Sequence, residues 1–240
     1  MTGVAVVTGG ARNLGRAIVL ALAGAGFDVV VNTRTDLDRA EAVAGEARDL
    51  GVRALAVRAD VTDGDAVAEL MRRAGGLGPL RVLVNNVALR THVPLDRLTF
   101  DDWRAVHAVV LDGAFRCVHA ALPAMRATAT DGGGGGRIIN LLGAKAMRGD
   151  PSRVHVAAAK YGLVGMTLAL AGACAADGIT ANAVSPGLVT PDDEHETVRL
   201  RGAVASTIAF LASAAASEIT GQVIEVGPKP GPTTPWRQAL

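Results

Sequence analysis

Short runs of β-branched and other apolar residues alternate with longer alanine-rich stretches along the whole chain. Continuous apolar runs are typical of strands buried on both faces, and the longer stretches repeat their apolar residues at helical spacing. The pattern predicts seven strands, at residues 4–9, 28–33, 53–59, 81–86, 137–142, 179–184 and 222–226. It predicts six helices between them, near residues 14–25, 36–50, 63–75, 100–127, 153–176 and 197–213.

Strands that alternate with helices indicate repeated βαβ units. We therefore expect an α/β fold, a doubly wound seven-stranded parallel sheet between two helical layers, with its ligand crevice at the carboxyl ends of the strands. A chain of 240 residues, half of them apolar, is long enough for one domain over residues 1–240. Residues 228–240 are rich in proline, which favours an extended arm over a helix or central strand.

Composition excludes several function classes. The net charge is +1, and the chain has no basic run and few aromatic residues, so we expect no nucleic-acid partner. Apolar runs such as residues 19–31 are broken well short of the roughly 20 residues of a membrane span, and the N-terminus lacks a signal-peptide pattern. These features predict a cytoplasmic protein without a membrane partner.

The cysteines and the acidic run do not indicate a metal site. Cys117 and Cys174 lie in separate helical patterns without a C-x-x-C spacing, which favours buried, reduced thiols. The sequence DDEHE at 192–196 lacks the H-E-x-x-H spacing and begins a predicted helix, where acidic residues suit the helix dipole. We therefore predict no metal.

A glycine-containing turn follows the first predicted strand. The sequence TGGARNLGRAI at 8–18 carries a strand into a helix, where backbone N–H groups and the helix dipole favour an anion. Glycines there let a pyrophosphate approach the main chain. The pattern predicts a phosphate cradle; the alternative is a glycine-rich turn that binds nothing.

Five motifs in order resemble the short-chain dehydrogenase/reductase family, from Thr8 to about Gly227. The turn resembles its T-G-x-x-x-G-x-G motif with Asn13 at the middle glycine, and asparagine tolerates the left-handed backbone this turn needs. The others are AD at 59–60, NNVA at 85–88, AAAK ending at Lys160 and SPGLVT at 185–190. The resemblance implies a Rossmann-like three-layer αβα fold.

The resemblance also implies a nicotinamide cofactor. Arginine at the end of the second strand accommodates a ribose 2′-phosphate, where an acidic residue would bind a 2′-hydroxyl. Arg34 and Arg12 therefore favour NADP(H), unless both are solvated surface charges. The cofactor-binding residues expected by resemblance and charge are Gly9, Arg12, Asn13, Leu14, Gly15, Arg34, Asp60, Val61, Asn85, Asn86, Lys160, Pro186, Gly187 and Thr190.

The catalytic positions depart from the family. Its members use a tyrosine four residues before the lysine as the acid, a serine after the fifth strand and an asparagine on the preceding helix. Counted from Lys160, the tyrosine position holds Val156; family spacing puts Gly143 at the serine position, and the sequence VHAVVLDGAF puts Val110 at the asparagine position. None of the three can transfer a proton, and residues 141–151 contain no Ser, Thr or Tyr in any register. Tyr161 cannot supply the acid in the family's way, because the residue four positions after it is Gly165 and not a lysine. Helical geometry also turns its side chain away from that of residue 156.

Few residues could replace the missing acid. His155 is the best candidate because histidine titrates near neutrality, and Lys145 is the second. Asp150, Arg90 and His92 are weaker candidates in the same region, and all five are more often packing or surface residues.

Three functions stay open. The first is an atypical biosynthetic enzyme of bacterial secondary metabolism that reduces a self-activated small-molecule acceptor, such as an iminium ion or a quinone-like ring. The others are a non-redox cyclisation, dehydration or isomerisation, and a non-catalytic binding subunit. The resemblance further implies a homodimer or homotetramer.

Overall fold

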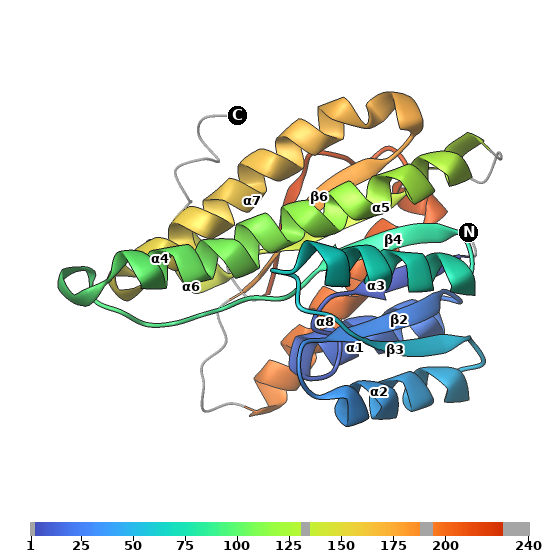
Figure 1. Cartoon of the computed structure of the whole chain (residues 1–240), viewed down its shortest axis with the longest axis horizontal. Coiled ribbons are helices and arrows are strands. Elements are labelled where there is room, and N and C mark those ends of the chain that lie inside the picture. The colour runs from blue at the N-terminus through green and yellow to red at the C-terminus, as the bar shows by residue number, and fades with distance from the viewer. Residues whose placement is uncertain (1–2, 131–134, 188–193, 228–240) are drawn as a thin grey trace.

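Seven parallel strands form one sheet, in the order β3-β2-β1-β4-β5-β6-β7, in the computed structural model of the chain (Figure 1). The structure describes residues 3–130, 135–187 and 194–227. The predicted sheet is confirmed, and the arm predicted at 228–240 lies outside the described residues. The strands are β1 Val4–Val7, β2 Asp28–Thr33, β3 Ala54–Arg58, β4 Leu80–Asn85, β5 Arg137–Leu141, β6 Thr180–Pro186 and β7 Val223–Val226.

Helices cover both faces of the sheet, which gives the three layers expected. Helices α1, α2 and α8 pack together on one face, and α3, α5 and α7 lie on the other (Figure 1). The helices are α1 Asn13–Gly24, α2 Leu37–Asp49, α3 Gly64–Leu77, α4 Phe100–His107, α5 Gly113–Thr130, α6 Ala144–Met147, α7 Val154–Ala173 and α8 Glu194–Ala212.

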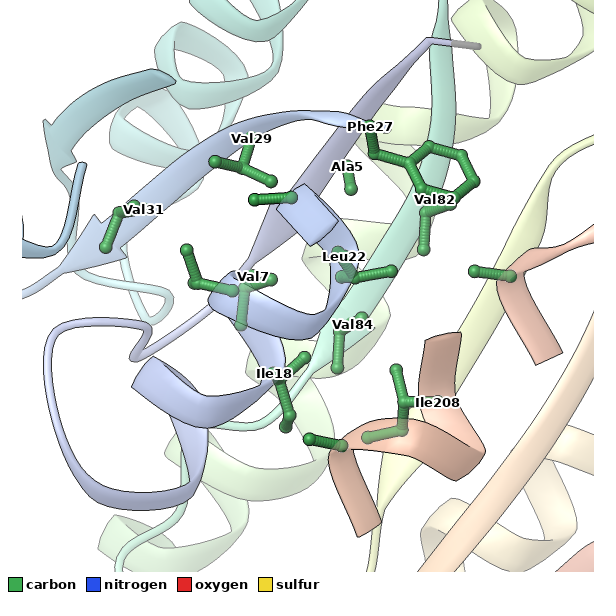
Figure 2. Close-up of a cluster of buried hydrophobic side chains, with 14 of the residues drawn as sticks. Ala5, Val7, Ile18, Leu22, Phe27, Val29, Val31, Val82, Val84 and Ile208 are labelled. Carbon is green, nitrogen blue, oxygen red and sulfur yellow. The ribbon is translucent and has the colours of Figure 1, made fainter. Parts of the chain in front are cut away.

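The central strands are buried on both faces, which explains their continuous apolar sequences. In β1, Ala5 and Val7 belong to the cluster under α1 and α8, whereas Val4 and Val6 belong to the cluster on the opposite face. Figure 2 shows the first cluster, with Ala5 and Val7 near side chains of α1, α8 and the neighbouring strands β2 and β4, labelled Ile18, Leu22, Ile208, Val29, Val31, Val82 and Val84.

The helix predicted at 100–127 is one helical stretch, but it is not α-helical throughout. Helices α4 and α5 are joined by a π-helical segment, Ala108–Asp112, in which the backbone bonds i to i+5. Val110, where the resemblance predicts the family's asparagine, lies within this wider turn and is buried. The short helix α6, directly after Gly143, was also not predicted from the sequence.

Two helical stretches, Phe100–Ala129 and Pro151–Ala173, are long and apolar enough to cross a membrane by length and composition alone. In this fold, α5 packs against β4 and α7 against β6. Helices that cover a sheet need an apolar inner face, so this packing accounts for their hydropathy.

Candidate functional site

A cleft of about 850 Å³ opens at the carboxyl ends of the strands. It lies where the strand order reverses, because β1 has β2 on one side and β4 on the other. This is the crevice in which doubly wound sheets bind their ligands, as the sequence predicted.

The turn between β1 and α1 forms one wall of the cleft and has the backbone that its sequence predicted. Gly9 has φ 63°, and Asn13, with φ 49°, is the one non-glycine residue with positive φ in the described part of the chain. A Cβ atom built on Gly15 would lie 2.1 Å from the carbonyl oxygen of Gly9. Only glycine at position 15 therefore permits this close turn.

Asn86 fixes the turn to the adjacent strand end. Its side-chain Nδ2 donates to the carbonyl oxygens of Thr8 at 2.9 Å and of Gly9 at 3.1 Å. The backbone N–H of Asn86 donates to Thr8 Oγ1 at 2.9 Å, and that hydroxyl donates to the carbonyl oxygen of Val84. The turn is thus held in place by hydrogen bonds between the residues that follow β1 and β4.

Arginines line the end of the cleft beyond β2. Arg34 follows the strand, Arg12 lies in the turn, and Arg39 lies in the first turn of α2. Arg39 was missed from the sequence; its place five residues after Arg34 is the signal that could have identified it. Asp36 also lines this end of the cleft. Its carboxylate accepts a hydrogen bond from the backbone N–H of Arg39 at 3.0 Å and so caps the N-terminus of α2.

Asn32 supports this end from the strand below and was also missed. Its Oδ1 accepts from the N–H of Gly9 at 3.2 Å, and its Nδ2 donates to the carbonyl oxygen of Ala59 at 3.0 Å. Asp60 directly follows Ala59, and its Oδ1 accepts hydrogen bonds from the backbone N–H of Thr62 at 2.9 Å and from the Thr62 hydroxyl at 2.8 Å. Both Asn32 and Asp60 line the cleft.

The cleft brings together most of the predicted cofactor residues. Asn85 is an exception, because its side chain is buried in the sheet and its Nδ2 donates to Asn140 Oδ1 at 2.9 Å. Thr190 lies outside the described residues. The others line the cleft, namely Gly9, Arg12, Asn13, Leu14, Gly15, Arg34, Asp60, Val61, Asn86, Lys160, Pro186 and Gly187.

Lys160 lies on α7 at the inner end of the cleft, where it is 2% exposed. Its Nζ donates to the carbonyl oxygen of Leu141, at the end of β5, at 2.5 Å. Burial lowers the pKa of Lys160 to about 7, and repulsion from the Arg90 guanidinium acts in the same direction. The amine can therefore lose its proton near neutral pH.

The wall beside Lys160 is hydrocarbon. Val156, one helical turn earlier on α7, and Gly143, after β5, both line the cleft. Val156 belongs to a buried apolar cluster with Val110, Leu142 and residues of α6. A Cβ atom on Gly143 would meet nothing within 4 Å, so a side chain would have free space there.

Tyr161 does not replace the missing phenol. Its hydroxyl donates to the carbonyl oxygen of Met147 at 3.0 Å, and the described residues that line the cleft do not include it. The phenol therefore packs beside α7, as helical geometry predicted.

His155 was predicted as the replacement acid, and the structure places its ring elsewhere. The ring is fully buried, its Nε2 lies 2.7 Å from Thr91 Oγ1, and burial lowers the pKa of His155. Within the described residues the lining of the cleft includes neighbouring Arg153 and Val156 but not His155. Successive helical side chains point about 100° apart, so the residue next to Val156 faces away from the cleft.

Of the remaining candidates for the acid, Arg90 is the one whose described side chain lines the cleft. The backbone of Lys145 lies in α6, and its side chain lies outside the described part of the structure. Asp150 accepts a hydrogen bond from Ser152 Oγ at 2.7 Å, and His92 contacts Arg153 at the mouth of the site.

Comparison with known proteins agrees with this geometry. The short chain dehydrogenase family profile matches residues 3–200. The 3-oxoacyl-(acyl-carrier-protein) reductase FabG of Staphylococcus epidermidis is 36% identical over 239 residues, 92% of this chain and 96% of that protein. Acetoin dehydrogenase YohF from Salmonella typhimurium has a TM-score of 0.82 at 31% identity, with 95% of each chain covered. The chain therefore belongs to the short-chain dehydrogenase family of oxidoreductases.

Proposed function

We propose that this chain is an NADP(H)-dependent biosynthetic reductase whose small-molecule acceptor needs no protonation from the enzyme at the moment of hydride transfer. An iminium ion or a quinone-like ring is such an acceptor. The observation that carries the proposal is one cleft in which an ordered nucleotide cradle meets the hydrocarbon wall of Val156 and Gly143.

The residues of the cleft fit the cofactor. The turn at Gly9 and Gly15 has no room for a Cβ atom at position 15, which suits backbone that is closely approached by a pyrophosphate. Arg12, Arg34 and Arg39 can bind a 2′-phosphate from several sides. When bound, the reduced nicotinamide supplies a hydride.

The lack of a proton donor at Val156 and Gly143 limits which acceptors can be reduced quickly. A positioned acid contributes about 10²–10⁴-fold to proton-transfer steps, so a simple ketone should be reduced slowly where valine and glycine replace the acid and its hydroxyl partner. Lys160 binds the nicotinamide ribose of the cofactor, as the family resemblance implies. An acceptor that carries a positive charge or conjugated carbonyls needs no proton at the moment of hydride transfer, so its rate of reduction falls little when the acid is missing.

The test has two steps. NADPH and NADH are first titrated against the purified chain by nicotinamide fluorescence, and we expect saturable binding with NADPH preferred. NADPH consumption is then followed with a cyclic iminium, an ortho-quinone and a simple ketone. We expect turnover with either of the first two and slow turnover with the ketone.

Other results identify the alternatives. Rapid ketone reduction by the unchanged chain would contradict the proposal and indicate an undetected acid. NADPH binding without consumption, across an acceptor panel that includes polyketide-like intermediates, would favour a non-redox rearrangement. A chain that binds neither nucleotide would favour a binding subunit.

Assembly and location complete the proposal. We propose a homodimer or homotetramer in the cytoplasm, acting on a small molecule with no metal, membrane or nucleic-acid partner. Among the described residues, no group of three or more His, Cys, Asp or Glu side chains could hold a metal ion.

A further inference from the structure

The ε-amine of Lys160 stands in an unusual setting for a lysine. It is almost fully buried, yet it lines a cleft large enough for a small molecule. The one hydrogen bond that the structure gives it goes to the Leu141 carbonyl, an uncharged acceptor to which either the ammonium or the neutral amine can donate. Val156 and Leu142 add hydrocarbon around it.

Nothing described in the cleft neutralises the ammonium form. Asp36 and Asp60 are the carboxylates among the described residues that line it, and they follow β2 and β3. Three and four strand positions separate them from β5, which corresponds to about 14 and 19 Å at about 4.8 Å per strand. The charged group that acts on Lys160 is the Arg90 guanidinium, a cation, and Arg153, which also lines the cleft, is paired with Asp150.

Burial and like charge together favour the neutral amine. With a pKa of about 7, roughly half of the Lys160 side chains are unprotonated at pH 7. An ordinary lysine with a pKa near 10.4 has fewer than about one in a thousand unprotonated at that pH. Only the neutral amine has the lone pair that attacks a carbonyl carbon, and desolvation beside another cation is a recognised way to activate a lysine.

We propose that Lys160 is a carbonyl-reactive amine, and that the cleft without nucleotide takes up a β-dicarbonyl compound and binds it covalently through this residue. The Nζ lone pair attacks a keto carbon, a proton moves from nitrogen to oxygen, and the C–O bond then breaks with loss of water. Loss of a proton from the carbon between the carbonyls leaves a conjugated enaminone. No oxidant or reductant is consumed.

The cleft has room for this adduct. No atom lies within 4 Å of a Cβ position on Gly143, and the aliphatic side chain of Val156 leaves an apolar surface for the alkyl part of the ligand. The Arg90 guanidinium can donate hydrogen bonds to the second carbonyl oxygen. The ligand class is therefore a compact β-dicarbonyl, with one carbonyl to react and one to be held.

The test uses acetylacetone as the probe, with the whole chain and no nucleotide. The chain has only three lysines, Lys145, Lys160 and Lys229, so the other two serve as internal controls. Enaminone formation is followed by its near-ultraviolet absorbance and located by peptide mass spectrometry. We expect Lys160 to react about tenfold faster than either control at pH 7, with its rate levelling off above about pH 8.

Two variants sharpen the result. Lys160→Arg keeps the cation but cannot form the enaminone, so the fast absorbance change should disappear while circular dichroism shows a folded chain. Arg90→Gln removes the like charge, so the pH at which the rate is half-maximal should move upward. The limiting rate at high pH should also fall, because the second carbonyl loses its guanidinium donor. Equal labelling of the three lysines, or a Lys160 rate that still rises above pH 9, would overturn the proposal, and this wild-type comparison stands even if a variant does not fold.

Discussion

Gly143 and Val156 stand where the resemblance to the family predicts a serine and a tyrosine. Both line the cleft beside Lys160, and position 143 has open space where a side chain would project. Both substitutions stay predictions: the tyrosine position is counted from Lys160, and the missing serine follows from residues 141–151, which contain no Ser, Thr or Tyr. The sequence could not show that the space at Gly143 is left open, which depends on the packing of α6 and α7.

Restoring the two side chains should restore ketone reduction. The double variant Gly143→Ser, Val156→Tyr places a hydroxyl and a phenol beside the Lys160 amine, which lowers the pKa of the phenol when charged. We expect NADPH-dependent reduction of a simple ketone to rise about 100-fold, measured as kcat/KM. The single variant Gly143→Ser is the control and should change little; no gain in the double variant would mean that the alignment is wrong.

Arg34 should decide between the two nicotinamide cofactors. Arg34→Ala removes one charged donor to the 2′-phosphate, so the Kd for NADPH should rise about 10- to 100-fold with that for NADH unchanged. Fluorescence titration measures both. Arg72, which pairs with Glu69 on the exposed side of α3, provides the matched control Arg72→Ala. Equal weakening of both nucleotides by Arg34→Ala would refute a role in phosphate recognition.

The sequence predicted His155 as the replacement acid, but its ring is not among the described side chains that line the cleft. A histidine next to the lost tyrosine position has the right chemistry, but adjacent helical residues face different directions, and this ring contacts Thr91 outside the cleft. Asn13 shows the opposite case, because its tolerance of positive φ predicted a backbone conformation that the structure contains. Local backbone preference could be inferred from sequence, whereas the direction of a buried side chain required the three-dimensional packing.

At the scale of elements, strands were easier to predict than the details of helices. Strands β1 and β2 contain the short apolar runs VAVV and VVV, each followed by a polar residue, which is typical of a buried strand. The π-helical segment between α4 and α5 carries no such signal, because one wider turn barely changes the hydrophobic periodicity. Helix α6 has only four residues, too few for any periodic pattern.

Helix α1 offers a matched pair of glycines. Gly15→Ala would place a Cβ atom 2.1 Å from the Gly9 carbonyl, so the turn must shift; we expect loss of NADPH binding and a free energy of unfolding lower by about 2 kcal/mol. Gly24→Ala, with nothing within 4 Å, should keep binding and leave stability unchanged or higher by up to about 1 kcal/mol. Urea unfolding and fluorescence titration test both; normal binding by the first variant would contradict the cradle.

For the whole molecule, the buried amine ties stability to pH. Lys160 has a pKa of about 7 in the folded chain and near 10.4 in the unfolded chain, so between these values the unfolded state binds more protons. Its contribution to the free energy of unfolding therefore rises with pH from about 7 to 10, by up to about 4 kcal/mol.

Urea unfolding of the wild type and Lys160→Met from pH 6 to 10 measures this contribution as a difference. The difference is needed because burial raises the pKa of Cys117 to about 12, which makes the folded chain lose stability above the pKa of an unfolded thiol. That effect is common to both proteins. A difference that does not change with pH would mean that Lys160 is charged in the folded chain at pH 7.

The proposed oligomer should depend on an apolar surface of α5 and α7. Phe115 is 56% exposed and borders a hollow that Leu111 and Met166 also line. Asp112 and Arg116 border the same hollow, so apolar side chains lie beside charged ones there, as they do at many protein contacts. We expect light scattering to give a dimer or tetramer for the wild type and a smaller species for Phe115→Asp; a monomeric wild type at micromolar concentration would contradict the assembly.

The hydrogen bonds between Thr8 and Asn86 have a mechanical consequence. They cross the seam between β1 and β4, where three strands on one side meet four on the other. A dinucleotide lying over this seam would act as a staple between the two parts of the sheet. Its departure should therefore speed amide exchange on both sides of the seam together, so that nucleotide occupancy is reported by the rigidity of the entire sheet.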